Sequence, residues 1–148
     1  MSDFSRFMKQ NKVADNGKLY EYVASKKFTD EKGNPLVWKF KKLSLRDYET
    51  LRDSFSYDKK VGEGKFTRFI SQINTKEFNA NLIINCCVEP NLNDAQLQDS
   101  YGVKGATNLL YEMIDDVGEY TDLITFIQKI HGLDVFGEDE ELETKAKN

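Results

Sequence analysis

The chain has 148 residues and a mass of 17.1 kDa, and its composition of 39% hydrophobic and 12% aromatic residues is sufficient for one globular core. No apolar run approaches the roughly 18 residues that a membrane-spanning helix needs, and the N-terminus lacks the apolar core of a signal peptide. These features argue against a membrane protein, and we expect the chain to stay in the cytoplasm.

The formal net charge of -4 is unevenly divided along the chain. Residues 1–80 carry 17 Lys and Arg against 11 Asp and Glu, and residues 81–148 carry 4 against 14, so the two parts have net charges of +6 and -10. A basic part can bind nucleic acid, but these lysines are scattered among acids and are not interleaved with stacking aromatic residues. We therefore favour a solvated surface over a nucleic-acid interface.

The N-terminal segment is predicted to form a short helix that Ser2 or Asp3 caps. Phe4, Phe7 and Met8 fall on one face of this helix. Because so short a helix is unstable alone, it needs a surface to lie on. We favour its own domain as that surface, with a partner protein as the alternative.

Residues 19–28 and 36–43 are predicted to be two strands joined by a turn. In the second strand Leu36, Trp38 and Phe40 alternate with lysines, which is typical of a sheet with one face in water. An isolated hairpin is marginal in water, so its apolar face must pack on helices or on further strands. Trp38 is interpreted as a core residue, with a recognition role as the minor alternative.

Ser44 and Asp47 resemble a capping box and predict a helix that buries Leu45, Tyr48 and Leu51. The chain beyond this helix carries weaker signals. The polar segment 57–64 is bracketed by glycine and predicts a mobile loop.

The apolar residues of segment 66–73 fit helical spacing, but the run is short and begins just after a glycine. We prefer an extended edge strand there over a helix. Thr75 is the predicted N-cap of a helix that runs to about Val88. Cys86 and Cys87 are the only cysteines, and their adjacency predicts small core residues rather than a disulfide framework or a metal site.

A turn begins at Pro90, and the chain breaks again at 101–105. Two further helical segments follow this break. The last of them starts at Gly118 and ends at His131, and Gly132 suits a left-handed cap. Its apolar stripe consists of Tyr120, Leu123, Ile124, Ile127 and Ile130. Such a stripe predicts a helix docked on the core.

The residues do not suggest catalysis or a bound cofactor. His131 is the only histidine, and a role as a helix cap explains it. The glycines of segment 102–105 lack the spacing of a phosphate-binding loop, and Asp115 with Asp116 is explained by the start of a helix rather than by a cation site. We therefore expect a non-enzymatic protein that acts through its surface, without metal or cofactor.

The predicted fold class is α+β, with a small antiparallel hairpin at 19–43 packed on a mainly helical part at 44–132. Both belong to a single domain, 1–137. The remaining segment, 138–148, is predicted to be a disordered acidic tail. Its first four residues are Glu138, Asp139, Glu140 and Glu141. We favour a solubilising role for the tail, with partner docking as the alternative.

Several stretches together resemble one known family. They are EPNLNDAQLQDSYGVKGATNLLYEM at 89–113, GEYTDLITFIQKIHG at 118–132 and KAKN at 145–148, joined upstream by SKKF at 25–28, DEKGNP at 30–35 and WKFKKL at 38–43. This pattern resembles the XkdN-like tail assembly chaperones of long-tailed phages and of phage-derived elements in Gram-positive bacteria. Lys104 stands where that family usually has methionine.

The resemblance implies a chaperone that binds the tape measure protein, keeps its apolar helices soluble and helps recruit tail tube subunits. Such a protein works in the host cytoplasm and is not expected in the mature virion. Many of these chaperones also have a frameshift-extended form, and this chain corresponds to the short one. The family implies no catalytic residue. Candidate partner-binding features are Phe4, Phe7 and Met8, the segment around Tyr57, and the acidic tail.

Other functions stay open alongside the chaperone. A structural tail or head-tail joining protein of the virion has a similar size and similar elements. An enzyme or a DNA-contacting regulator has the least support from the residues. Homo-oligomers are compatible with the sequence, although no heptad seam specifies one.

Overall fold

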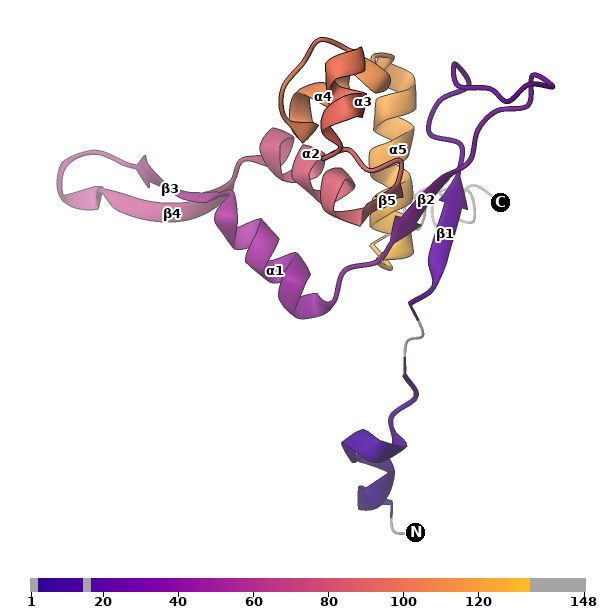
Figure 1. Cartoon of the computed structure of the whole chain (residues 1–148). Helices are drawn as coiled ribbons and strands as arrows, with labels where there is room; N and C mark the ends of the chain where they lie inside the picture. The colour runs from indigo at the N-terminus through magenta and orange to yellow at the C-terminus, as the bar shows by residue number, and fades with distance from the viewer. Residues whose placement is uncertain (1–2, 15–16, 134–148) are drawn as a thin grey trace, which may run out of the picture.

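A three-stranded antiparallel sheet lies at the centre of the fold, in a computed structural model that describes residues 3–14 and 17–133 (Figure 1). The strands are β1 (Leu19–Tyr22), β2 (Trp38–Lys41) and β5 (Cys87–Glu89), in the order β1-β2-β5. In β1 and β2, Leu19 pairs with Lys41 and Tyr22 with Trp38. The central strand is therefore the one whose sequence alternates most regularly.

One face of this sheet forms part of the core, and the other meets water. Trp38 and Phe40 are buried, whereas Lys41 is exposed, as the alternation predicts. Phe126 of helix α5 covers the apolar face, because its ring stacks on Tyr22 at 4.2 Å and meets Phe40 edge-on at 5.6 Å between centroids. Within residues 3–14 and 17–133, a helix thus covers one face of the sheet only.

Five α-helices complete the described chain, and Figure 1 shows four of them grouped beside the sheet. They are α1 (Leu45–Ser54), α2 (Thr75–Cys86), α3 (Ala95–Ser100), α4 (Ala106–Met113) and α5 (Val117–Ile130). Four begin at a side chain that accepts a backbone N–H in their first turn. These caps are Ser44, Asn74, Asp94 and Asp116.

The predicted α+β class is confirmed, with differences at element ends. The first hairpin has shorter strands than expected, because 23–37 is a long connection that carries only an isolated bridge between Thr29 and Pro35. The cap of α2 is Asn74, one residue before the predicted Thr75. This helix stops at Cys86 because the next residues pair with β2 as the third strand.

Helix α1 departs from its predicted burial. Its cap is confirmed, since the Ser44 hydroxyl accepts the Asp47 N–H at 3.1 Å. Leu45, however, is 74% exposed, and the prediction that it is buried is wrong. Tyr48 is half-buried and meets the ring of Phe78 edge-on at 5.6 Å. An apolar residue at the first helical position therefore lies outside the face that packs on α2.

A second hairpin connects α1 to α2 and projects from the body (Figure 1). It consists of β3 (Ser56–Val61) and β4 (Arg68–Ile73). The extended segment predicted at 66–73 is confirmed, but the mobile loop predicted at 57–64 is wrong. Because neither face of this hairpin is buried in the core, β3 has polar residues on both faces and no alternation marks it as a strand.

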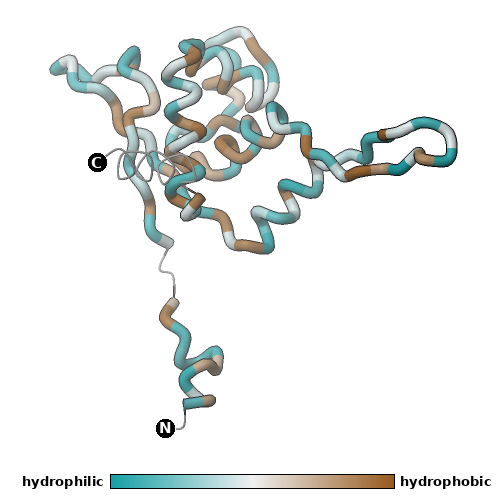
Figure 2. The backbone as a smooth tube through the Cα atoms, turned by 180° about the vertical axis from the view of Figure 1, so that it is seen from behind, coloured by the Kyte–Doolittle hydropathy of each residue, from teal (hydrophilic) through white to brown (hydrophobic). Residues whose placement is uncertain are grey.

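The N-terminal arm, defined as residues 3–14, stands away from the body and from the β3–β4 hairpin, as Figure 2 shows from behind. It forms 3-10 helices at Phe4–Phe7 and Lys9–Asn11, and Asp3 makes no side-chain cap. Phe4 is 76% exposed and Phe7 is 86% exposed. The expected docking of this segment on its own domain is therefore wrong for the described structure.

His131 has the structural role that its position predicts. It is the C-cap of α5, and its Nδ1 lies 2.7 Å from the carbonyl oxygen of Ile127. Its Nε2 accepts the backbone N–H of Leu43 at 2.9 Å, so Nδ1 carries the proton and donates. Gly132 follows with φ +78°, which confirms the left-handed cap. The single histidine thus ties the end of α5 to the chain that leaves β2.

Candidate functional site

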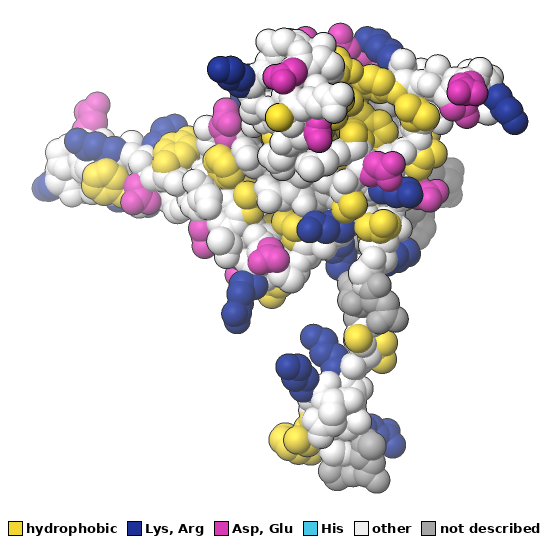
Figure 3. Space-filling view, in the orientation of Figure 1, with side chains coloured by type: hydrophobic (Ala, Val, Ile, Leu, Met, Phe, Trp, Pro, Cys, Tyr) yellow, Lys and Arg dark blue, Asp and Glu magenta, His cyan; other side chains and the backbone are white. Residues whose placement is uncertain are grey.

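The apolar groove is a hollow of about 460 Å³ between the β1–β2 connection and helix α3. Hydrophobic side chains gather on this face, between the helices and the loop that follows β1 (Figure 3). The groove is lined by Phe28, Leu36, Val37, Trp38, Glu89, Pro90, Leu97, Ser100, Tyr101 and Met113. Only one of these residues is charged, so the surface favours apolar ligands.

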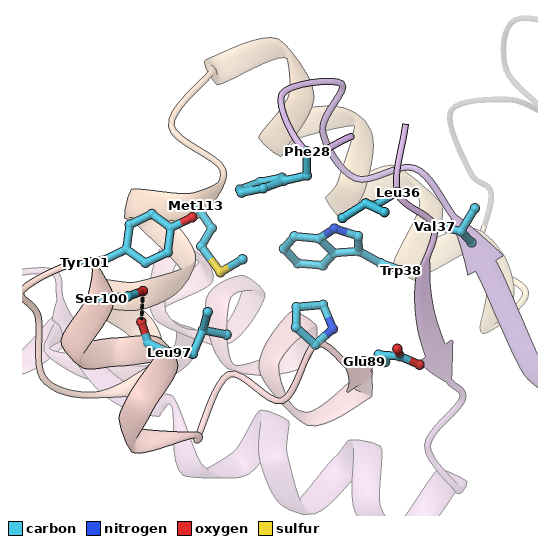
Figure 4. A pocket seen from close by; sticks show the side chains of 10 residues that line it. Phe28, Leu36, Val37, Trp38, Glu89, Leu97, Ser100, Tyr101 and Met113 are labelled. Carbon is cyan, nitrogen blue, oxygen red and sulfur yellow. Dashed lines mark hydrogen bonds between the residues drawn. The ribbon is translucent and has the colours of Figure 1, made fainter. Parts of the chain in front are cut away.

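Aromatic and aliphatic side chains from two parts of the chain face each other across the groove (Figure 4). Phe28 and Trp38 form one wall, with 6.1 Å between their ring centroids. Leu97, Tyr101 and Met113 form the opposite wall. Since even Trp38 and Leu97 are 59 residues apart in sequence, only the folded chain creates this site.

Two polar side chains of helix α3 are hydrogen-bonded within the protein. The Ser100 hydroxyl donates to the carbonyl oxygen of Leu97 at 2.7 Å. The Gln98 side chain donates to the Leu92 carbonyl at 2.9 Å and accepts the Gly105 N–H at 3.0 Å. These bonds hold α3 between its two flanking loops.

Two exposed ion pairs link the walls beside the groove. Lys27 Nζ lies 2.7 Å from Asp115 Oδ1, and Lys39 Nζ lies 3.5 Å from Glu89 Oε2. The hydrogen bond and charge of Lys27 lower the pKa of Asp115 below its ordinary value. Solvent screens the attraction within such exposed pairs, so these pairs add little to the stability of the fold and mainly orient the segments that border the groove.

The arrangement offers burial for an apolar segment and no obvious chemistry. Among residues 3–14 and 17–133, no group of three or more His, Cys, Asp or Glu side chains is placed to hold a metal ion. The groove contains one carboxylate, Glu89, and no paired acid and base. Its geometry is that of a recognition surface.

Among the described residues, those that the sequence predicts for partner binding lie outside the groove and are not brought together. Phe4, Phe7 and Met8 are on the N-terminal arm. Tyr57 is half-exposed on β3, where its hydroxyl donates to Gln72 at 3.1 Å. Glu138, Asp139, Glu140 and Glu141 lie outside the described residues.

The groove itself was missed by sequence reasoning. Trp38 was assigned to the core, which is correct for a side chain that is 3% exposed, yet its ring also lines the groove. Leu97 and Tyr101 stand four residues apart at the end of a short helix, a spacing that places two side chains on one face. That spacing was the available signal, but nothing local shows that Phe28 lies opposite.

The two cysteines give a chemical test of the packing. Burial raises the pKa of Cys86 and of Cys87 to about 12, from an ordinary value of 9.0, and the Cys87 thiol also donates to the Pro90 carbonyl at 3.1 Å. Both thiols are therefore protonated at neutral pH, and the thiolate is the reactive form. We expect neither to react quickly with Ellman's reagent in the folded protein, and both to react in guanidinium chloride.

The raised pKa values of the two thiols also determine how the free energy of unfolding changes at alkaline pH. Between pH 9.0 and about pH 12 the unfolded thiols lose protons that the folded ones keep, so the free energy of unfolding falls as pH rises through that window. Replacing both cysteines by alanine should weaken this alkaline slope. Rapid labelling of the native protein at neutral pH would contradict the buried placement.

Comparison with known proteins identifies the family. The model of the family described as phage XkdN-like tail assembly chaperone protein matches residues 4–146, nearly the whole chain. The chain belongs to the XkdN-like tail assembly chaperone family. This confirms the resemblance inferred from the sequence motifs. The matched segment includes the groove, the β3–β4 hairpin and all of the N-terminal arm except Asp3.

Two Bacillus subtilis (strain 168) proteins are related to this chaperone. Uncharacterized protein YqbN is 25% identical over 129 residues, which cover 86% of this chain and 83% of YqbN. Phage-like element PBSX protein XkdN is 24% identical over 126 residues, which cover 84% of this chain and 80% of XkdN. The similarity therefore extends over most of each protein.

A solved structure supports the fold of this chaperone. The crystal structure of YqbN superposes with a TM-score of 0.67 at 19% identity, covering 89% of this chain and 98% of YqbN. At that identity the likeness concerns the fold alone. Within the described residues of the chaperone, no helix has the length and apolarity needed to span a membrane.

Proposed function

We propose that this tail assembly chaperone binds the tape measure protein and receives apolar helical segments of it in the apolar groove. The observation that carries the proposal is a groove of about 460 Å³ whose walls are aromatic and aliphatic and whose only charged residue is Glu89. An amphipathic helix presents apolar side chains at i, i+3, i+4 and i+7, and such a stripe is what an apolar groove binds.

The expected affinity follows from the number of side chains that become buried. Each fully buried Leu, Ile or Phe contributes roughly 1.5–3 kcal/mol of transfer free energy. Association costs at least about 4 kcal/mol of lost translational and rotational freedom, so one anchor is insufficient and several must dock together. A chaperone needs such reversible binding, because the client must leave when the tail tube assembles around it.

The remaining parts of the proposed role concern when and where the chain acts. We infer that it works in the host cytoplasm during tail assembly, helps bring tail tube subunits to the tape measure protein and is left out of the mature virion. Their support is membership of the family. They are compatible with a binding surface that bears exposed charge beside its apolar groove.

Co-expression tests the proposal directly. Leu36 lines the groove and is 44% exposed, so Leu36→Lys places a charge in the groove without emptying the core. We expect the wild-type chain to raise the soluble yield of its cognate tape measure protein and to co-purify with it, and the variant to lose roughly tenfold or more of that binding. Soluble yield and pull-down measure the two effects.

The matched control is Leu45→Lys, which introduces the same charge at a residue that is 74% exposed and lies on α1 outside the groove. It should behave as the wild type does. The proposal fails if the wild-type chain neither solubilises nor retains the tape measure protein. The groove assignment fails if both leucine variants bind equally well.

A further inference from the structure

The N-terminal arm bears apolar side chains that it does not bury. Phe4 and Phe7 are 76% and 86% exposed, and Met8 is 43% exposed. The arm is nevertheless ordered within itself, because the Asn11 side chain donates to the Ser5 carbonyl at 2.6 Å and backbone bonds close each 3-10 turn. A short preformed segment with two exposed phenylalanines has the character of a docking peptide.

The apolar groove has complementary chemistry. Its walls offer aromatic and aliphatic surface, and its volume of about 460 Å³ falls within the range of about 300–1,000 Å³ that is typical of ligand pockets. The net charge of the arm is also opposite to that of the segment that supplies one wall of the groove. Residues 3–14 carry three basic residues and one acid, a net of +2, whereas residues 89–116, which supply one wall, carry six acids and one lysine, a net of -5.

Two of those acids, Glu89 and Asp115, already pair with lysines of the opposite wall. With these two lysines included, segment 89–116 keeps a net charge of -3. Its other acids, Asp94, Asp99, Glu112 and Asp116, are exposed on this segment but do not line the groove. A basic, apolar arm is therefore better suited to this groove than a neutral or acidic one.

Strand register separates the arm from the groove of its own chain. The chain beyond the arm enters β1 at Leu19, which pairs with Lys41 at one end of the sheet. The groove lies at the other end, where Tyr22 pairs with Trp38. Figure 1 shows the arm leading away from that end. To reach its own groove the arm must reverse along the whole strand, whereas a neighbouring molecule meets it without such a reversal.

We propose that the N-terminal arm inserts Phe4 and Phe7 into the apolar groove of a second copy of this chain. The inference shares its groove with the proposed function, so the arm occupies the chaperone's binding surface until a client displaces it. Self-association and client binding then compete, and the free chaperone does not expose its apolar surface. The contact joins two different surfaces, the arm of one copy and the groove of another. Two copies form a closed dimer when each inserts its arm into the groove of the other.

The test uses the full chain and two variants that disable one half of the contact each. Phe4→Ser/Phe7→Ser removes the apolar arm, and Leu36→Lys blocks the groove, with Val37→Lys as a second groove variant at a residue that is 46% exposed. Light scattering over a concentration series should give at least twice 17.1 kDa for the wild type. We expect the dissociation constant to rise about tenfold or more in each variant.

Mixing provides the sharpest result. The arm variant keeps an intact groove and the groove variant keeps an intact arm, so an equimolar mixture should associate although neither variant does alone. Trp38 is the only tryptophan of the chain and lines the groove, so its emission should change on mixing and with wild-type concentration. A synthetic peptide of residues 1–14 should reproduce the change when added to the arm variant. Leu45→Lys should match the wild type in mass.

Three outcomes would overturn the proposal. They are a wild-type chain that stays monomeric throughout, folded variants that fail to complement each other, and Trp38 emission that depends on the arm but not on concentration, which indicates docking within one chain. Failure here is distinct from failure of the proposed function. The arm variant keeps the groove, so it should still solubilise the tape measure protein if only the self-association is wrong.

Discussion

Replacing Phe40 by alanine is expected to lower the free energy of unfolding by about 3–5 kcal/mol. Phe40 has no exposed surface and lies on β2, the central strand of the sheet. Its ring packs against Trp38 at 6.4 Å and against Phe126 of α5 at 5.6 Å between centroids. Truncation removes the transfer free energy of a whole ring and leaves a cavity where sheet and helix meet.

Urea denaturation followed by far-UV circular dichroism measures this loss. Phe40→Leu should lose clearly less, because it keeps most of the buried volume. The neighbouring Lys41→Ala is the matched control, since Lys41 is exposed on the wet face of the same strand and should change stability by less than about 0.5 kcal/mol. If Phe40→Ala and Lys41→Ala proved equally mild, the packing of α5 on this strand would be wrong.

Phe40 also shows why this part of the fold was predictable. The alternation of apolar residues and lysines in β2 follows from a sheet with one buried face, and the structure confirms it. The stripe of α5 was read in the same way, and Leu123 and Ile127 have no exposed surface. A residue pattern is informative when one face of one element meets the core.

The missed elements lack that condition. The strand β3 has water on both faces, so its sequence Ser56–Val61 carries no period and resembles a loop. The strand β5 has only three residues and follows α2 directly at Cys87, with no breaker between them to announce a change of structure. In both cases the pairing partner, and not the local sequence, makes the strand.

The groove was unpredictable for a related reason. Trp38 has a sufficient local explanation as a core residue, and Phe28 and Tyr101 have one as partly buried residues, and all three come from separate elements. The site exists only as their juxtaposition, which depends on the three-dimensional path of the 23–37 connection. By contrast, the apolar residues of the arm can be identified from the sequence alone, because the terminus around them is otherwise polar.

Glu119 lies in the first turn of α5 and has a structural role with a large expected effect. Its Oε1 accepts the hydroxyl of Ser25 at 2.8 Å, and its Oε2 accepts the backbone N–H of Lys26 at 2.9 Å. Ser25 is only 1% exposed, and although its Oγ also accepts the backbone N–H of Lys27 at 3.2 Å, the proton of its hydroxyl is donated to Glu119. The carboxylate thus fixes the connection that leads to Phe28, one wall of the groove.

Glu119→Ala should therefore lower the free energy of unfolding by about 2–4 kcal/mol, because hydrogen bonds to a charged acceptor are lost and a buried hydroxyl donor loses its acceptor. Chemical denaturation measures the loss, and Trp38 emission should shift because Phe28 is no longer held beside it. Asp122→Ala, also an acid on α5 but exposed, is the matched control and should be nearly neutral.

A double-mutant cycle separates the hydrogen bond to Ser25 from other effects of Glu119. Ser25→Ala removes the donor that Glu119→Ala would leave without an acceptor, so the double variant should cost less than the sum of the two single variants by about 1 kcal/mol or more. If the two losses simply add, the carboxylate stabilises the chain only through the end of α5, and the connection to the groove wall is held by its apolar contacts instead.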